Sequence, residues 1–179
     1  MNMDLSEVVR PVRILGIDPG THYMGIGVIC SEGNGDNLTY IHSEVLVPNR
    51  RDPIQERLHQ LHSSLGEVVS RWKPSHVAME QPFVAKNVRS ALAVGQAQAV
   101  GMIVSAAAGV DVYTYSPSEV KSAVTDHGGS SKEQVQEMVA ILLELSTEPL
   151  EPDAADALAV AICHLHAHRA ETLKSSLRS

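Results

Sequence analysis

Three segments in the first quarter of the chain carry apolar residues with the spacing of β-strands. They are VRILGID (12–18), MGIGVIC (24–30) and LTYIHSEVLV (38–47). Alternating apolar positions and β-branched residues are typical of strands. The stretch SEGNGDN before the third segment has the Gly and Asn residues of a hairpin loop. These segments therefore predict an antiparallel meander of three strands.

The spacing of apolar residues then changes to that of helices. Between Asp52 and Trp72 apolar residues recur three and four positions apart, which predicts a helix with Asp52 as N-cap, Pro53 at the first position and Pro74 beyond the end. Further strands are predicted at 76–80 and 110–115. Further helices are predicted at 88–108, after the SPSE capping box (116–119), at 132–145 and at 153–168.

The resulting order β-β-β-α-β-α-β-α, with extra helical turns near the end, predicts an α/β fold. Such an order is typical of a mixed sheet with helices on its faces. Periodicity alone does not give the strand order. With 179 residues and no internal repeat, we expect a single domain at 12–168, a short extension at 1–11 and a tail at 169–179.

Composition and charge bear on where the protein acts and on whether it binds nucleic acid. No apolar run reaches the length of a membrane span, and the first ten residues lack the apolar region of a secretory signal, so we expect a cytoplasmic protein. Cys30 and Cys163 fall in strand and helix patterns and are expected to be buried free thiols. The net charge of −7 argues against a nucleic-acid partner. That objection weakens if several acids gather around divalent ions.

Four carboxylates stand where elements begin or end. Asp18 and Glu80 end the first and fourth predicted strands, and Asp153 and Asp156 lie in the first turn of the last helix. The spacing of three residues puts these two on one helix face. If the two strand ends are neighbours and the helix crosses that edge, all four carboxylates form one cluster.

A cluster of oxygen ligands favours Mg²⁺ or Mn²⁺. Two such ions about 4 Å apart would activate a water and stabilise the leaving oxygen of a phosphodiester. Other interpretations stay open on spacing alone. Acids are common at helix N-termini because of the helix dipole, and Asp18 could simply begin a turn. Glu80 is harder to explain in this way, because it follows a buried strand.

Four segments taken together carry a family resemblance. They are ILGIDPGTHYMGIGVI, AMEQPFVAKNVRSALAVGQAQAV, SPSEVKSAVTDHGGSSKEQVQEMV and PDAADALAVAICH. In this order they resemble the RuvC family of Holliday-junction resolvases, from about Arg13 to His166. The resemblance implies an RNase H-like fold and a metal-dependent endonuclease that nicks four-way DNA junctions symmetrically, leaving 5′-phosphate and 3′-hydroxyl ends.

The resemblance also implies site residues. Asp18, Glu80, Asp153 and Asp156 match the catalytic, metal-binding carboxylates. Lys121 and Lys132 match lysines that lie near the scissile phosphate and count as catalytic and DNA-binding. Taken singly, each of these two lysines would be interpreted as a surface residue.

A second set of residues is expected to contact DNA. Phe83, the only Phe in the chain, matches an aromatic that stacks at the junction crossover, where an apolar wedge can insert between unstacked bases. Lys86 beside it and Arg89 nearby add positive charge. Without the family, Phe83 would be interpreted as a loop residue that caps the core, and Lys86 as a solvated lysine.

Partners are implied in the same way. Small residues recur four apart in the helix at 88–108, as in Ala91, Gly95 and Ala99. This spacing allows close helix packing, either within the chain or against a second copy. RuvC-like proteins are homodimers through this region, and the resemblance implies a RuvA–RuvB branch-migration complex as a further partner.

The sequence also leaves three other interpretations open. His164 and His168 have zinc-ligand spacing, but a solvated helix end is the favoured interpretation because no further ligand completes the set. GIDPGT resembles a phosphate loop of the actin and sugar-kinase superfamily, an architecture that needs two such domains. A non-catalytic junction-binding module is the third possibility, although it has no need of carboxylates at strand ends.

Overall fold

A computed structural model of the protein describes residues 11–32, 37–81, 88–145 and 150–177. The strands are β1 (Val12–Asp18), β2 (Met24–Ser31), β3 (Leu38–Leu46), β4 (His76–Glu80) and β5 (Asp111–Tyr115). The helices are α1 (Ile54–Trp72), α2 (Val88–Ala107), α3 (Pro117–Thr125), α4 (Lys132–Leu142) and α5 (Pro152–Ser176). The order of elements agrees with the prediction.

The strands form one mixed sheet of five in the order β3-β2-β1-β4-β5. β1, β2 and β3 pair antiparallel as a meander, whereas β4 pairs parallel with both β1 and β5. This confirms the predicted α/β class with an antiparallel meander plus parallel strands. It also makes β1 and β4 neighbours that end at the same edge of the sheet.

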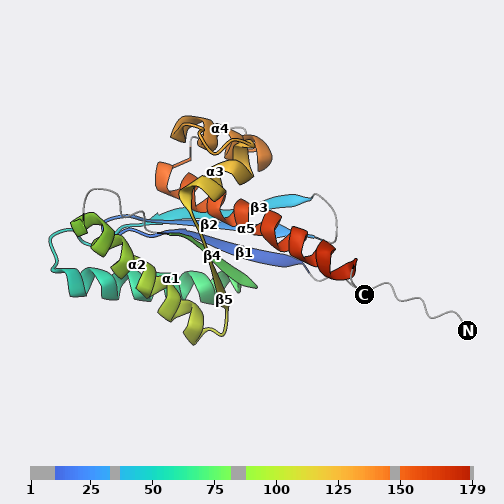
Figure 1. Cartoon of the computed structure of the whole chain (residues 1–179). Coiled ribbons are helices and arrows are strands. Elements are labelled where there is room, and N and C mark those ends of the chain that lie inside the picture. Colours follow the sequence, from blue (N-terminus) through green and yellow to red (C-terminus); the bar gives the residue numbers. More distant parts are fainter. Residues whose placement is uncertain (1–10, 33–36, 82–87, 146–149, 178–179) are drawn as a thin grey trace, which may run out of the picture.

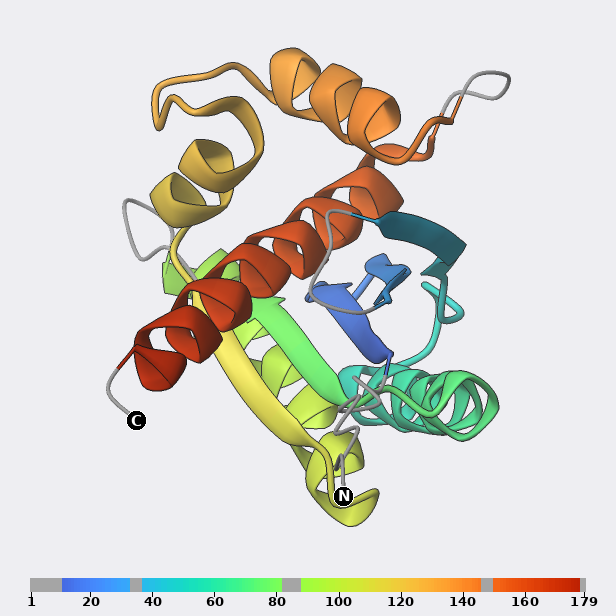
Figure 2. The same ribbon diagram turned by 90° about the vertical axis from the view of Figure 1, so that its right-hand side faces the viewer.

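Helices cover both faces of the sheet (Figures 1 and 2). Helices α1 and α2 lie on one face, where they bury a core with Leu15, Ile17 and Met79. Helices α3, α4 and α5 lie on the other face, around a core that includes Ile14 and Leu158. Alternation along β1 explains the split, because successive side chains of a strand point to opposite faces.

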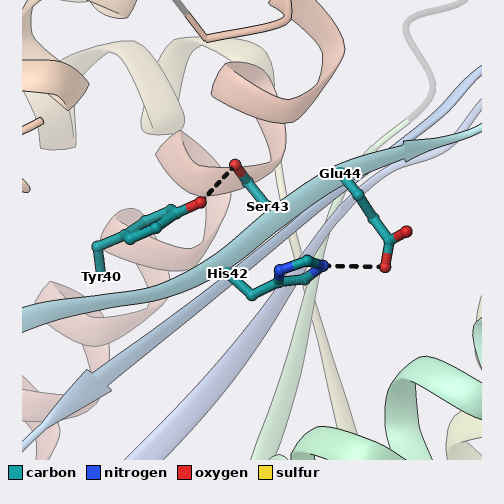
Figure 3. Close-up of polar contacts among 4 residues, drawn as sticks. All are labelled: Tyr40, His42, Ser43 and Glu44. Carbon is teal, nitrogen blue, oxygen red and sulfur yellow. Dashed lines mark hydrogen bonds and ion pairs between the residues drawn. The ribbon is translucent and has the colours of Figure 1, made fainter. Parts of the chain in front are cut away.

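The edge strand β3 contains a β-bulge. One extra residue, Ile41, separates the pairs that Tyr40 and His42 make with β2. Figure 3 shows the result: Tyr40 and Ser43 lie on one side of the strand, and His42 and Glu44 on the other. The Tyr40 and Ser43 hydroxyl oxygens are 3.0 Å apart, and His42 Nε2 is 3.1 Å from Glu44 Oε1. Bulges and paired polar side chains are typical of edge strands.

Three helix ends differ from the prediction. The N-cap of α1 is Pro53, because the Asp52 carboxylate accepts hydrogen bonds from the side-chain amides of Asn49 and Gln60 instead of capping the helix. Helix α4 ends at Leu142 rather than at residue 145. Helix α5 continues to Ser176, well beyond 168, because Ala, Glu, Leu and Lys in the added turns favour helix.

Helix α2 corrects the expectation that no apolar segment is long enough to cross a membrane. In the described part of the chain it is the one helix with that length and composition. This is weak evidence for a span, since core helices can have the same composition. One face of α2 packs on the sheet through Ala97, Val100 and Val104, whereas Leu92 and Ile103 are exposed.

Candidate active site

Two carboxylates project from adjacent strand ends. Asp18 is the last residue of β1 and Glu80 the last of β4, and these strands pair in parallel. Asp18 alternates with Gly16 and Ile14, so its side chain points to the face covered by α5. Glu80 stands on the same face, two residues after Ala78. The predicted juxtaposition of the two strand ends is therefore present in the structure.

Glycines in the sheet let α5 lie directly on these strands. A Cβ added at Gly25, the β2 partner of Asp18, would clash with the backbone carbonyl of Asp153. A Cβ added at Gly16 would clash with the carbonyl of Ala157. Because only glycine permits this close approach, the first turn of α5 can place its acids against the end of β1. The strand pattern of the sequence does not indicate this role of the glycines.

Three carboxylates meet at this edge of the sheet. Oxygens of Asp18, Asp153 and Asp156 all lie within 4.8 Å of one another, and each residue is half-buried. Burial, followed by the charges of Asp156, Glu80 and Asp153, raises the pKa of Asp18 to about 7. The charge of Lys132 lowers this pKa but does not outweigh burial and the three acids, so Asp18 resists ionisation.

Glu80 lies beside the cluster and faces a pocket. The pocket has a volume of about 280 Å³ and is lined by Glu80, Asp156, Lys121, Lys132 and apolar residues of α3, α4 and α5. Burial and then the charge of Asp156 raise the pKa of Glu80, while the two lysines lower it. All four predicted carboxylates are thus in electrostatic contact, although Glu80 is not one of the three whose oxygens converge.

The two predicted lysines line the same pocket from two different helices. Lys132 begins α4 after the Ser131 N-cap, and its Nζ is 2.5 Å from Asp156 Oδ2. Burial alone would lower the pKa of Lys132, but the hydrogen bond and the charge of Asp156 outweigh it and raise the pKa. Lys121 lies on α3 and lowers the pKa of Glu80.

The other residues expected to contact DNA do not line this pocket in the described part of the chain. Phe83 and Lys86 lie outside the described residues. Arg89 is exposed in the first turn of α2. Gln98 is buried on the same helix.

The expectation of a solvated helix end is wrong for His164. Its side chain is only 2% exposed. Its Nδ1 is 2.7 Å from the Tyr115 hydroxyl, and its Nε2 is 2.9 Å from His76 Nδ1. Burial, with the charges of His76 and His168, lowers the pKa of His164 to about 4, so the ring is neutral and both of its nitrogens are hydrogen-bonded.

Replacing Tyr115 with Phe should destabilise the protein by about 1–2 kcal/mol, because a buried nitrogen of His164 loses its partner. Urea unfolding at pH 7 measures this difference. Tyr113 offers a matched control, because its ring stacks on that of His164 with the two ring centroids 4.3 Å apart. Tyr113→Phe keeps the ring and should change the free energy of unfolding by less than about 0.5 kcal/mol. Equal effects of the two substitutions would contradict the role given to the Tyr115 hydroxyl.

The carboxylate cluster fits a hard divalent cation. Its donors are all oxygens, they come from two rigid elements, and their mutual repulsion is what a cation would relieve. Lys132 already neutralises part of this charge at Asp156. The raised pKa of Asp18 means that a cation would have to compete with a proton for this oxygen at pH values below about 7.

Comparison with known proteins shows the family of this chain. The family model described as crossover junction endodeoxyribonuclease RuvC matches residues 14–164. The chain belongs to this family. A RuvC of Dehalococcoides mccartyi is 50% identical over 159 residues, which cover 89% of this chain and 94% of the relative. A RuvC of Chloroflexus aggregans is 47% identical and covers 91% of this chain and 97% of its own.

Solved structures give the same result for the fold. The structure entitled "T. thermophilus RuvC in complex with Holliday junction substrate" matches with a TM-score of 0.83 at 35% identity, over 90% of this chain and 97% of that one. The yeast mitochondrial resolvase Ydc2 matches with a TM-score of 0.60 at 14% identity, over 94% and 88%, which bears on the fold alone. The architecture is RNase H-like, as the sequence resemblance implied.

Proposed function

We propose that this protein is a structure-specific endonuclease that resolves four-way DNA junctions in recombination and repair. It would make paired symmetric nicks that leave 5′-phosphate and 3′-hydroxyl ends. The observation that carries this proposal is the convergence of Asp18, Asp153 and Asp156 at one sheet edge of a chain in the RuvC family. A relative of 35% identity has been solved with a Holliday junction substrate.

The site residues divide into two chemical groups. Asp18, Asp153 and Asp156, completed by Glu80, would hold two Mg²⁺ or Mn²⁺ ions. When bound, these ions supply an activated water and a counter-charge for the leaving oxygen. Lys132, which pairs with Asp156, and Lys121 line the same pocket as Glu80, where their positive charge can bind the scissile phosphate.

The alternatives considered from the sequence have less support. A junction-binding module without catalysis has no use for a carboxylate whose pKa is raised to about 7 by its own burial and by the charges of neighbouring acids. An ATPase of the actin type would require a second such domain, and the described residues form one sheet.

The partners follow from the substrate. Exposed Leu92, Met102 and Ile103 on α2 support a homodimer through this helix, and a two-fold dimer supplies two sites for two nicks. Phe83, Lys86 and Arg89 would meet the DNA at the crossover. A RuvA–RuvB complex remains the proposed partner in branch migration. A DNA substrate agrees with the cytoplasmic location expected from the sequence.

A nicking assay tests the proposed function. The protein is mixed with a labelled synthetic four-way junction or a matched linear duplex, in Mg²⁺ or Mn²⁺. We expect paired nicks in the junction only, which disappear with chelator. Tight junction binding without nicks in either metal would favour the binding module, and nucleotide binding by calorimetry would favour the ATPase.

Replacing Lys132 with Met should lower the nicking rate on the order of 10²-fold at neutral pH, because a charge facing the phosphate is lost. The same lysine lowers the pKa of Asp18. Without it, ionisation of Asp18 requires a higher pH, so the acid limb of the pH–rate profile should move to higher pH. Lys174→Met, in the last turn of α5, is the control. An acid limb at the wild-type position would contradict the coupling of Lys132 to Asp18.

A further inference from the structure

The loop before α1 is built to present arginines outward at the same sheet edge as the carboxylates. The Asn49 backbone N–H donates to Gln60 Oε1 at 2.8 Å. The Asn49 side chain accepts from the Arg51 N–H at 3.2 Å and donates to Asp52 Oδ1 at 2.9 Å. With this loop held from both sides, Arg50 and Arg51 are exposed.

The acid in this loop does not neutralise the arginines. One oxygen of Asp52 accepts from Asn49, and the other accepts from Gln60 Nε2 at 2.7 Å. Among residues 11–32, 37–81, 88–145 and 150–177, neither Arg50 nor Arg51 has an acidic partner within 4 Å. Glu56 lies nearby in the first turn of α1 but forms no ion pair with either arginine. The positive charge of Arg50 and Arg51 is therefore available to another molecule.

An exposed aromatic ring orients one of these arginines. The Arg50 guanidinium carbon lies 4.2 Å from the centroid of the Tyr23 ring, and Tyr23 is 42% exposed. A guanidinium stacked on a ring keeps its N–H donors free at its edge. Tyr23 itself belongs to the β1–β2 turn that follows Asp18.

A third arginine ties this turn to α1. Arg57 Nη1 donates to the Thr21 carbonyl at 3.1 Å and lies 3.0 Å from His22 Nδ1. The β1–β2 turn, the loop into α1 and the first turn of α5 all lie at the left-hand edge of the sheet in Figure 1. The arginine loop and the carboxylate cluster are thus held at one edge by a common turn.

We propose that Arg50 and Arg51, with Tyr23 as the platform for Arg50, bind backbone phosphates of the duplex arm that enters the carboxylate site. The inference rests on the proposed function and extends it to a surface on the side of the sheet opposite α5. Arginine is suited to this contact because its planar donors match phosphate oxygens. It also explains how a chain of net charge −7 can hold DNA, since positive charge is concentrated where the backbone passes.

The test is the salt dependence of junction binding. The full chain with a labelled four-way junction is titrated by fluorescence anisotropy over a range of KCl concentrations, in Ca²⁺ to prevent cleavage. The variant Arg50→Ala with Arg51→Ala should bind about 10-fold or more weakly. Its plot of log K against log[KCl] should be shallower by about 2, since each lost phosphate contact removes roughly 0.9 from the slope.

A matched control removes two charges at the opposite edge. Arg71 and Lys174 stand in the last turns of α1 and α5, so Arg71→Ala with Lys174→Ala has the same net charge as the test variant. It should keep the wild-type slope. Tyr23→Phe should bind as the wild type does, whereas Tyr23→Leu should bind about 2- to 5-fold more weakly because Arg50 loses its platform.

The outcomes separate the two proposals. If the wild type nicks the junction but the test variant has the slope of the control variant, the phosphate surface is wrong and the proposed function stands. If the wild type binds neither junction nor duplex, both are wrong. Unchanged thermal midpoints of the variants show that a loss of binding does not come from unfolding.

Discussion

Replacing Asp18 with Asn is expected to lower the nicking rate on the order of 10³-fold or more while junction binding is retained. The substitution removes a charged oxygen from the centre of the carboxylate cluster, and cation binding there depends on that charge. Removing a negative charge from the protein lowers its own repulsion of the DNA phosphates, so binding should be retained. Nicking rates and anisotropy on the same labelled junction measure both effects.

The same variant should be more stable than the wild type in chelator above pH 7. In the folded chain the pKa of Asp18 is raised to about 7 from an ordinary value of 3.8. At pH values between these two pKa values, Asp18 has lost its proton in the unfolded chain but keeps it in the folded chain. Wild-type stability therefore falls as pH rises from about 4 to 7, and Asn abolishes this loss, on the order of 2–4 kcal/mol.

Two comparisons make this result specific. Mg²⁺ should raise the thermal midpoint of the wild type and leave that of Asp18→Asn nearly unchanged, because the variant lacks one of the three converging carboxylates that would hold the cation. Asp111→Asn changes an exposed acid at the start of β5, at the far end of the sheet, and should have the wild-type rate. Nicking by Asp18→Asn at the wild-type rate would refute the assignment of this carboxylate.

Replacing Gly25 with Ala should produce the second large effect, on stability and activity together. The added Cβ would overlap the backbone of Asp153, which cannot rotate away as a side chain can. Overpacking of this kind costs about 1–3 kcal/mol or more. Since the first turn of α5 must move, the nicking rate should fall about 10²-fold even where the variant folds, because a displacement near 1 Å is enough for such a loss.

Gly66→Ala is the control for this prediction. Gly66 lies within α1, and a Cβ there would meet no atom within 4 Å. Alanine in a helix interior should stabilise the protein by up to about 1 kcal/mol. Thermal unfolding and the nicking assay compare the two variants. A Gly25→Ala protein with the wild-type midpoint and rate would show that α5 does not depend on this contact.

Most of the secondary structure and the identity of the acids can be predicted from the sequence alone. Strand and helix spacings differ, so the order of elements could be predicted, and Asp18, Glu80, Asp153 and Asp156 were recognisable at element ends. Helix ends were less predictable. Asp52 has the chemistry of an N-cap, but its carboxylate is taken by Asn49 and Gln60, contacts that depend on how the loop folds.

Which of these residues meet depends on how the elements pack in three dimensions. Periodicity reports which face of an element is apolar and carries no information on strand order, so the adjacency of β1 and β4 had to come from the fold. The same holds for His164, whose partners Tyr115 and His76 are 49 and 88 residues away. It holds for Gly25 as well, since a glycine in a strand pattern does not show what packs against it. The carboxylates of the cluster repel one another, so they stay close together only because the packing of α5 on the sheet holds their backbones in place. That packing exists only in the folded chain.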